Sequence, residues 1–190
     1  MVRKWFLSSL LVIFTFSMAY AAGDPFQFAK SKTEEVISIV ANKKLPEATK
    51  KQKIENIIDE IIYWDYVSRS VLGVHYRGLS KEDYKEFVDK FRRYIKSTYA
   101  RKFIRYNGEK VEFTKDERQG DLAKIYANII TNDGKRIPVI AVVKEVGDKW
   151  LITDIYIEGV SMVANYRSQI HNVITQKGFR ALLDMLDKKA

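Results

Sequence analysis

The hydrophobic pattern of this chain changes its period twice, and that change restricts the fold more than any other feature. From residue 25 to residue 106, apolar side chains recur every three or four positions, the period of a helix that faces a core. Between residues 107 and 158 they alternate with polar residues or form β-branched runs, which is typical of strands. After Gly159 the helical period returns. Helices, then a sheet, then helices predict an α+β fold.

The helical parts carry recognisable start and stop signals. Asp24-Pro25 is typical of an N-cap followed by proline at the first helical position, and Ser80 to Asp83 has the spacing of a capping box. Gly73 or Gly78 is expected to end the third helix. The predicted helices cover residues 25–42, 46–62, 66–72, 80–103 and 163–177, with a short amphipathic tail through residue 186.

The middle of the chain predicts a four-stranded antiparallel sheet. Runs at 111–113, 122–131, 137–146 and 150–157 are separated by turn residues, and Asp133-Gly134 is a strong hairpin signal. Pro138 within the third run predicts a bulge or an edge position there. The second and third runs are apolar on both faces, so either helices cover both faces of the sheet or one face lines an apolar cavity.

The first twenty-one residues are expected to be a secretory signal peptide. Arg3 and Lys4 form a basic head, residues 5–20 are almost entirely apolar, and residues 19–21 (AYA) have the small-residue pattern of a cleavage site. The alternative, an N-terminal membrane anchor, would need a longer apolar stretch. Cleavage would lower the formal charge from +9 to +7. We therefore expect an exported chain of residues 22–190, mostly helical over 22–106, a sheet over 107–158 and helical over 159–190, with no nucleic-acid partner.

The residues offer little for catalysis. Cysteine is absent, which excludes thiol nucleophiles, thiolate metal sites and disulfides, and the two histidines, His75 and His171, have no metal-ligand spacing. Asp154 lies within an apolar strand, where a carboxylate can be a general base but more often binds backbone amides or an arginine. No metal, no cofactor and no catalytic residues are therefore expected.

Several segments resemble the MlaC family, also called the toluene-tolerance auxiliary family. The most specific is residues 157–170 (IEGVSMVANYRSQI). Residues 97–101 (STYAR) and 106–111 (YNGEKV) resemble the family's mid-chain block, and residues 71–73 (VLG) and 150–154 (WLITD) fall in the expected order. The resemblance extends over essentially the whole predicted mature chain.

This resemblance implies a soluble, monomeric, periplasmic phospholipid carrier that is not an enzyme. It implies a curved, four-stranded sheet of the nuclear-transport-factor type (NTF2-like) packed with helices around an apolar cavity. Phospholipid would be cargo, held by its acyl chains. The implied partners are an outer-membrane lipoprotein complex and an inner-membrane Mla-type ABC transporter complex with a ring-forming substrate-binding protein. The basic helix surfaces suggest transient contact with membranes or with acidic partners.

We hypothesise that apolar residues from the helices and from the sheet line the cavity: Tyr66, Leu72, Tyr99, Phe103, Ile129, Val139, Val142, Val163, Tyr166 and Ile170. Any of them could instead be ordinary core. Arg167 is the candidate for the head group, although pairing with Glu158 or Asp154 is the more common role for such an arginine. Two other function classes stay open: a small isomerase or dehydratase that uses Asp154 or His171, and a periplasmic adaptor that binds only protein.

Overall fold

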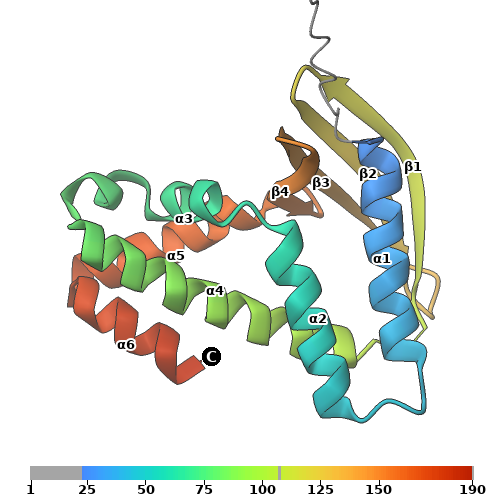
Figure 1. Cartoon of the computed structure of the whole chain (residues 1–190), viewed down its shortest axis with the longest axis horizontal. Helices are drawn as coiled ribbons and strands as arrows, with labels where there is room; N and C mark the ends of the chain where they lie inside the picture. The colour runs from blue at the N-terminus through green and yellow to red at the C-terminus, as the bar shows by residue number, and fades with distance from the viewer. Residues whose placement is uncertain (1–22, 107, 190) are drawn as a thin grey trace, which may run out of the picture.

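A computed structural model describes residues 23–106 and 108–189 of the protein (Figure 1). The predicted signal peptide, residues 1–21, lies outside the described residues. Among the helices of the described part, none is both long enough and apolar enough to cross a membrane.

The helices begin and end where local signals require. The Asp24 carboxylate accepts hydrogen bonds from the backbone N–H groups of Phe26 and Gln27, and the Ser80 hydroxyl accepts one from Asp83 N at 3.0 Å, so both predicted caps are confirmed. The helices are α1 (Pro25–Ala41), α2 (Glu47–Ile61), α3 (Trp64–Leu72), the 3-10 helix η1 (Gly73–Gly78), α4 (Lys81–Ile104), α5 (Met162–Lys177) and α6 (Phe179–Lys189).

The sheet is an open antiparallel meander with the order β1-β2-β3-β4-β5. Its strands are β1 (Lys110–Gln119), β2 (Leu122–Ile130), β3 (Arg136–Val146), β4 (Lys149–Ile157) and β5 (Val160–Ser161). The α+β class is confirmed, but the predicted number of four strands is wrong for the described chain. Glu158 and Gly159 both have positive φ values, 50° and 80°, the pattern of a two-residue type I′ turn. That turn folds β5 back onto β4. A strand of two residues is too short to produce a periodic pattern in the sequence.

Of the two alternatives predicted for Pro138, the bulge is absent, and the structure shows the edge position, just outside the β3–β4 ladder. Pro138 pairs opposite Asn128 in regular register, and its carbonyl accepts a hydrogen bond from Glu158 N at 2.9 Å. That side of β3 meets β4 only from Val139 onward, where Val139 pairs with Ile157, so the missing proline N–H removes no ladder bond. The irregular positions fall instead in β1 near Phe113 and at the β3–β4 pairing near Val142.

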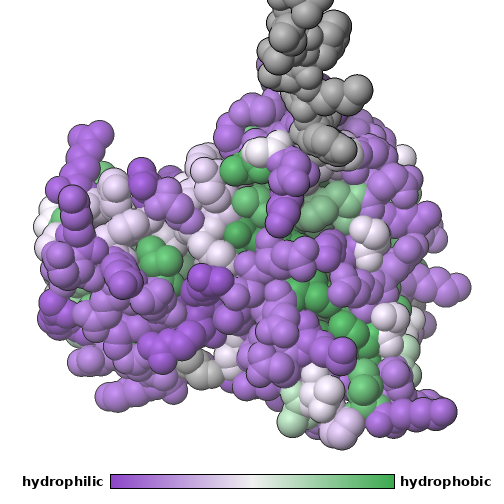
Figure 2. Space-filling view, in the orientation of Figure 1, coloured by the Kyte–Doolittle hydropathy of each residue, from purple (hydrophilic) through white to green (hydrophobic). Residues whose placement is uncertain are grey.

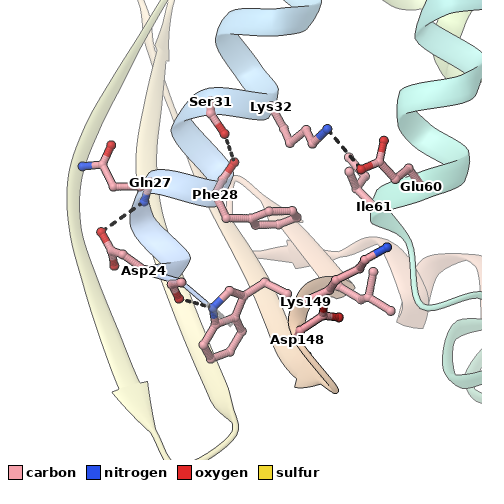
Figure 3. Close-up of a pocket in the computed structure, with 12 residues that line it drawn as sticks. Asp24, Gln27, Phe28, Ser31, Lys32, Glu60, Ile61, Asp148 and Lys149 are labelled. Carbon is pink, nitrogen blue, oxygen red and sulfur yellow. Dashed lines mark hydrogen bonds and ion pairs between the residues drawn. The ribbon is translucent and has the colours of Figure 1, made fainter. Parts of the chain in front are cut away.

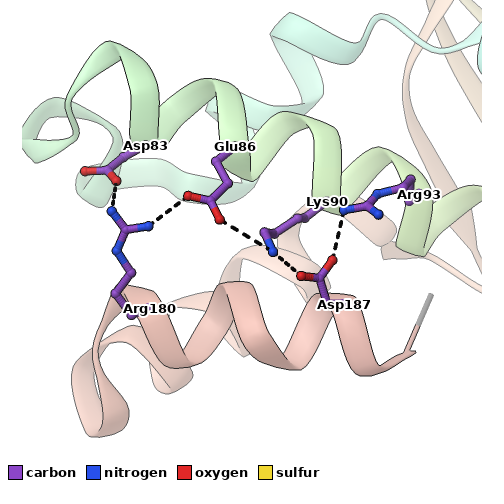
Figure 4. A network of polar contacts seen from close by, with 6 residues as sticks. All are labelled: Asp83, Glu86, Lys90, Arg93, Arg180 and Asp187. Carbon is purple, nitrogen blue, oxygen red and sulfur yellow. Dashed lines mark hydrogen bonds and ion pairs between the residues drawn. The ribbon is translucent and has the colours of Figure 1, made fainter.

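The elements form a sheet side and a helical lobe (Figure 1). The curved sheet lies on one side with α1 along it, α2 stands beside α1, and α3, α5 and α6 gather around the far part of α4. Helix α6 is tied to α4 by a network of charged side chains (Figure 4): Asp83, Glu86, Lys90 and Arg93 on α4, with Arg180 and Asp187 on α6. Beneath it, three leucines of α6 are fully buried.

A half-buried carboxylate fixes α2 against α4. Asp59 accepts two hydrogen bonds from the Arg92 guanidinium, one of them 2.7 Å long, and lies 3.4 Å from Lys96 Nζ. Burial alone would raise the pKa of the Asp59 carboxyl, but these two cations outweigh it and hold that pKa below its ordinary value of 3.8.

A second carboxylate joins the sheet to α5. Asp154 of β4 accepts hydrogen bonds from Ile155 N at 2.8 Å, from Val163 N at 3.0 Å and from the Ser161 hydroxyl at 2.5 Å. Ser161 in turn accepts a bond from Ala164 N and is the N-cap of α5. Asp154 therefore binds donors that the first turn of α5 cannot satisfy by itself.

Acidification should weaken the α2–α4 contact. Because the folded pKa of Asp59 is depressed, its ionised form stabilises the fold above the unfolded pKa of about 3.9, and this stability is lost as the pH falls through the folded value. Asp59→Asn should cost about 1 kcal/mol at pH 7. Urea unfolding at pH 7 and at pH 3 should show the cost shrinking at the lower pH; an unchanged cost would contradict the assignment.

Loss of the Asp154 carboxylate should loosen α5. Asp154→Ala leaves the Val163 and Ile155 N–H groups without their acceptor, at an expected cost of about 2 kcal/mol in the free energy of unfolding. Asp154→Asn keeps one acceptor oxygen and should cost less. Hydrogen exchange at residues 162–165 should rise more in the alanine variant than in the asparagine variant, and equal exchange in both would argue against this role.

Candidate functional site

The apolar interior of the described chain is divided into two clusters that share no buried residue. The larger, the helical cluster, lies among α2 to α6: Ile54, Ile58, Trp64, Val71, Leu72, Phe87, Phe91, Ile95, Ala100, Ile170, Leu182, Leu183 and Leu186. The smaller, the sheet cluster, consists of Ala123, Ile125, Val143 and Trp150 and is covered by the first turns of α1. Helix α1 reaches both, since Phe26 and Phe28 pack on the sheet cluster and Val36 and Ile39 on the helical one.

One face of the sheet carries apolar side chains well beyond the sheet cluster. Cross-strand partners share a face, and on this face Ile129 pairs with Ile137, and Val139 pairs with both Ala127 and Ile157. Along β2 the side chains are buried at 123, 125 and 127, and only half-buried at Ile129. Ile137, Val139 and Ile157 are also half-buried, and they belong to neither cluster. We call Ile129, Ile137, Val139, Ile155 and Ile157 the uncovered ladder.

The opposite face of the sheet is more polar than the sequence suggested. Val142 lies there, between Lys124 of β2 and Asp154 of β4, and is half-buried. Tyr126 on the same face donates a hydrogen bond to Glu117 at 2.7 Å. The structure therefore brings Ile129 and Val139 together on one face and places Val142 on the other.

Five of the ten hypothesised cavity residues lie together in the helical lobe. Leu72 and Ile170 are buried members of the helical cluster, and Val163, Tyr99 and Tyr166 pack against it. The Tyr166 hydroxyl donates to the Tyr99 hydroxyl across 3.5 Å. Burial raises the pKa of both phenols, so both stay neutral near pH 7. This pair is a small polar contact at the edge of the otherwise apolar helical cluster.

Two of the hypothesised residues face solvent. The side chain of Tyr66 is 47% exposed and stacks on Tyr63, and that of Phe103 is 40% exposed in the last turn of α4. In the described chain neither belongs to an apolar cluster.

Arg167 has a different partner from those considered in the sequence. Its Nε donates to the carbonyl of Ser70 at 2.6 Å, and its aliphatic part lies against Gly73, where a Cβ would come within 3.3 Å. Glycine is favoured at position 73 for two reasons: its φ of 55° suits glycine, and a Cβ there would crowd the Arg167 side chain. Glu158 pairs instead with Lys135. The pairing of Arg167 with Glu158 or Asp154 was therefore wrong, and Arg167 links α5 to the end of α3.

The two residues of the enzyme hypothesis have structural partners. Both carboxylate oxygens of Asp154 accept hydrogen bonds from the start of α5 and from β4, as the backbone-binding alternative predicted. His171 of α5 lies 3.0 Å from His75 of η1, measured from Nδ1 to Nε2. Among the described residues, no three histidine, aspartate or glutamate side chains are grouped so that they could hold a metal ion.

A cleft of about 430 Å³ opens between α1, α2 and the β3–β4 turn (Figure 3). Phe28, Ile61 and Trp150 contribute apolar walls, while Lys32 and Glu60 pair at 3.3 Å near its rim. In Figure 2, apolar surface gathers between α1 and α2 and towards the sheet, interrupted by polar side chains. None of the ten hypothesised residues lines this cleft. Its charged rim and volume near the lower end of the ligand-pocket range, about 300–1,000 Å³, suit a small ligand better than two acyl chains.

Three members of the uncovered ladder are not among the cavity residues predicted from the sequence: Ile137, Ile155 and Ile157. The hairpin signal at Gly134 could have identified the first. In the structure Gly134 has a φ of 84° and closes a turn that pairs Ile129 with Ile137. The apolar pattern of β4 alone cannot place Ile155 and Ile157, because an irregular register near Val142 shifts the pairing of β3 with β4.

Comparisons with known proteins agree with this architecture. A family model described as MlaC protein matches residues 30–188. The toluene tolerance protein ttg2D of Pseudomonas putida is 21% identical over 169 residues, which cover 85% of this chain and 78% of that protein. A solved structure of a phospholipid-binding protein from Ralstonia solanacearum, in complex with a phospholipid, has the same fold. Its TM-score is 0.74 at 18% identity, over 87% of this chain and 96% of that one. The match over residues 30–188 shows that this chain belongs to the MlaC family.

Proposed function

We propose that this protein is a non-catalytic periplasmic carrier that holds a glycerophospholipid by its acyl chains. The observation that carries the proposal is the uncovered ladder, a set of apolar side chains that are only half-buried on a sheet face. A cavity wall has this character before cargo fills it. The relative from R. solanacearum is named for phospholipid binding and was solved with a phospholipid, which supports the same cargo here.

The division of the interior offers a place for the chains. The helical cluster and the sheet cluster share no buried residue, so a space between them would be bounded by two separate cores, linked through α1. Chains inserted between them would meet the uncovered ladder on one side. On the other they would meet the side chains around Tyr99, Val163 and Tyr166. The nuclear-transport-factor-like architecture and the transfer between outer-membrane and inner-membrane Mla-type complexes belong to the same proposal.

The free-energy cost of exposing acyl chains to water favours a carrier that shields them. Exposing two acyl chains of about 16 carbons to water costs on the order of 25 kcal/mol, at roughly 0.8 kcal/mol for each methylene. Moving the chains from a bilayer into an apolar cavity exchanges one apolar medium for another, so the net free energy can be near zero. Loading and release then need no chemistry in this protein, which fits the structural bonding of Asp154.

Native protein that has never met detergent should carry phospholipid in a near-stoichiometric amount. Organic extraction followed by mass spectrometry and phosphate assay would measure lipid per chain. Protein purified without lipid would contradict the carrier proposal and would favour an adaptor that binds only protein.

Substitutions that fill the space should displace the cargo. Val139→Trp on the uncovered ladder and Val163→Trp on α5 should each lower co-purified phospholipid severalfold, at a cost of about 1–3 kcal/mol in stability. Val74→Trp is the matched control, because Val74 is 76% exposed on η1. Circular dichroism would verify folding. If both cavity variants keep the lipid of the control, the acyl chains lie elsewhere.

A further inference from the structure

The net positive charge of the predicted mature chain is concentrated in three short segments. Residues 43–55 contain five lysines and two glutamates, residues 101–110 contain two lysines, two arginines and one glutamate, and residues 188–189 are both lysine. Together they carry a net charge of +8, whereas residues 22–190 carry +7. The remainder of the chain is therefore close to neutral, at −1.

The fold brings these segments to one end of the molecule, which we call the basic end. Helix α2 crosses the second half of α4, and Asp59 near the end of α2 binds Arg92 in the middle of α4. In Figure 1 the last turns of α4 lie behind the lower part of α2, close to where α2 begins. Arg101 of α4 donates to the carbonyl of Lys189 at 3.2 Å, which places the end of α6 beside them.

The neighbouring turn between β2 and β3 does not add to this charge. Its Lys135 pairs with Glu158 at 3.1 Å, and Arg136 pairs with Glu112 at 2.8 Å. The opposite end of α4, about 36 Å away for a helix of 24 residues, carries a mixture of both signs, including Glu82 and Asp83.

We propose that the basic end docks on anionic phospholipid membranes. Charge complementarity is the first argument, because a surface with a large net positive charge on an otherwise neutral protein favours an extended negative surface. The choice of residue is the second argument: nine of the eleven cations are lysine and two are arginine. Lysine is depleted at protein–protein interfaces, whereas it suits delocalised attraction to a headgroup layer.

An exposed aromatic side chain lies within the same end. Phe103, 40% exposed, follows Lys102 in the last turn of α4, and the Lys102 ammonium lies 5.0 Å from the centre of the Tyr99 ring. Cations next to an exposed aromatic ring are typical of surfaces that lie at the headgroup level of a bilayer. Docking by this end is independent of the cargo proposal, since it concerns the outer surface and not the interior.

Vesicle sedimentation with the mature chain tests the proposal. Binding to vesicles of 30% phosphatidylglycerol in phosphatidylcholine is expected at 50 mM salt, with little binding at 500 mM salt or to pure phosphatidylcholine. The charge variant combines Lys43→Gln, Lys44→Gln, Lys53→Gln and Arg105→Gln, all exposed residues of the basic end. Each cation removed should lower the affinity for anionic vesicles about fivefold, so the affinity of the charge variant should fall by about 10²–10³-fold.

A matched variant removes the same charges elsewhere: Arg77→Gln, Lys81→Gln, Lys85→Gln and Lys124→Gln, also exposed. Its affinity for the anionic vesicles should fall by less than about tenfold. Equal losses in the two variants would overturn the assignment to the basic end. Failure of the unmodified chain to bind anionic vesicles at 50 mM salt would overturn membrane docking and leave an acidic protein as the occupant. Cargo is scored separately, as phospholipid per chain in the supernatant, so loss of one property does not imply loss of the other.

Discussion

The separation of the apolar interior into two clusters is the constraint on which the rest of the structure depends. A protein of this size normally gathers its buried side chains into one core, but here the helical cluster and the sheet cluster share no buried residue. Helix α1 spans both: Phe28 packs near its start on the sheet cluster, and Val36 packs further along on the helical one. Polar contacts therefore matter more than usual for keeping the parts in place. Asp154 acts at such a joint, because it binds β4, which carries Trp150 of the sheet cluster, to α5, which carries Ile170 of the helical cluster.

The main elements of the fold could be predicted because they follow local rules. Helical and alternating periods depend only on which side of an element faces a core, and caps such as Ser80 depend on a few neighbouring residues. The fifth strand could not be predicted, because two residues have no period and its turn needs a positive φ at Glu158, an uncommon conformation for glutamate. The behaviour of Pro138 depends on where β4 ends opposite it, which is a property of register and not of composition.

The hypothesised cavity residues show the limit of the same reasoning. Periodicity assigns a side chain to a face but does not say what covers that face. Val139 and Val142 are three residues apart and so lie on opposite faces of β3. Leu72 and Phe103 both belong to helical stripes, yet Leu72 is fully buried and Phe103 is exposed, because in the last turn of α4 it is Ile104, and not Phe103, that packs against the helical cluster. Arg167 contacts Ser70, 97 residues away in the chain, and no local pattern could have indicated that partner.

The end of α4 connects the two proposals physically. Tyr99 packs against the helical cluster while Lys102, one turn later, lies over its ring at the basic end. A carrier docked by that end would have the wall of its proposed cavity within one or two helical turns of the headgroups. The two interactions also respond differently to salt: burial of acyl chains is nearly independent of ionic strength, whereas attraction between exposed charges is screened over about 8 Å at physiological salt. Contact with the membrane can therefore be brief while the cargo stays bound, which is the combination that a shuttling carrier requires.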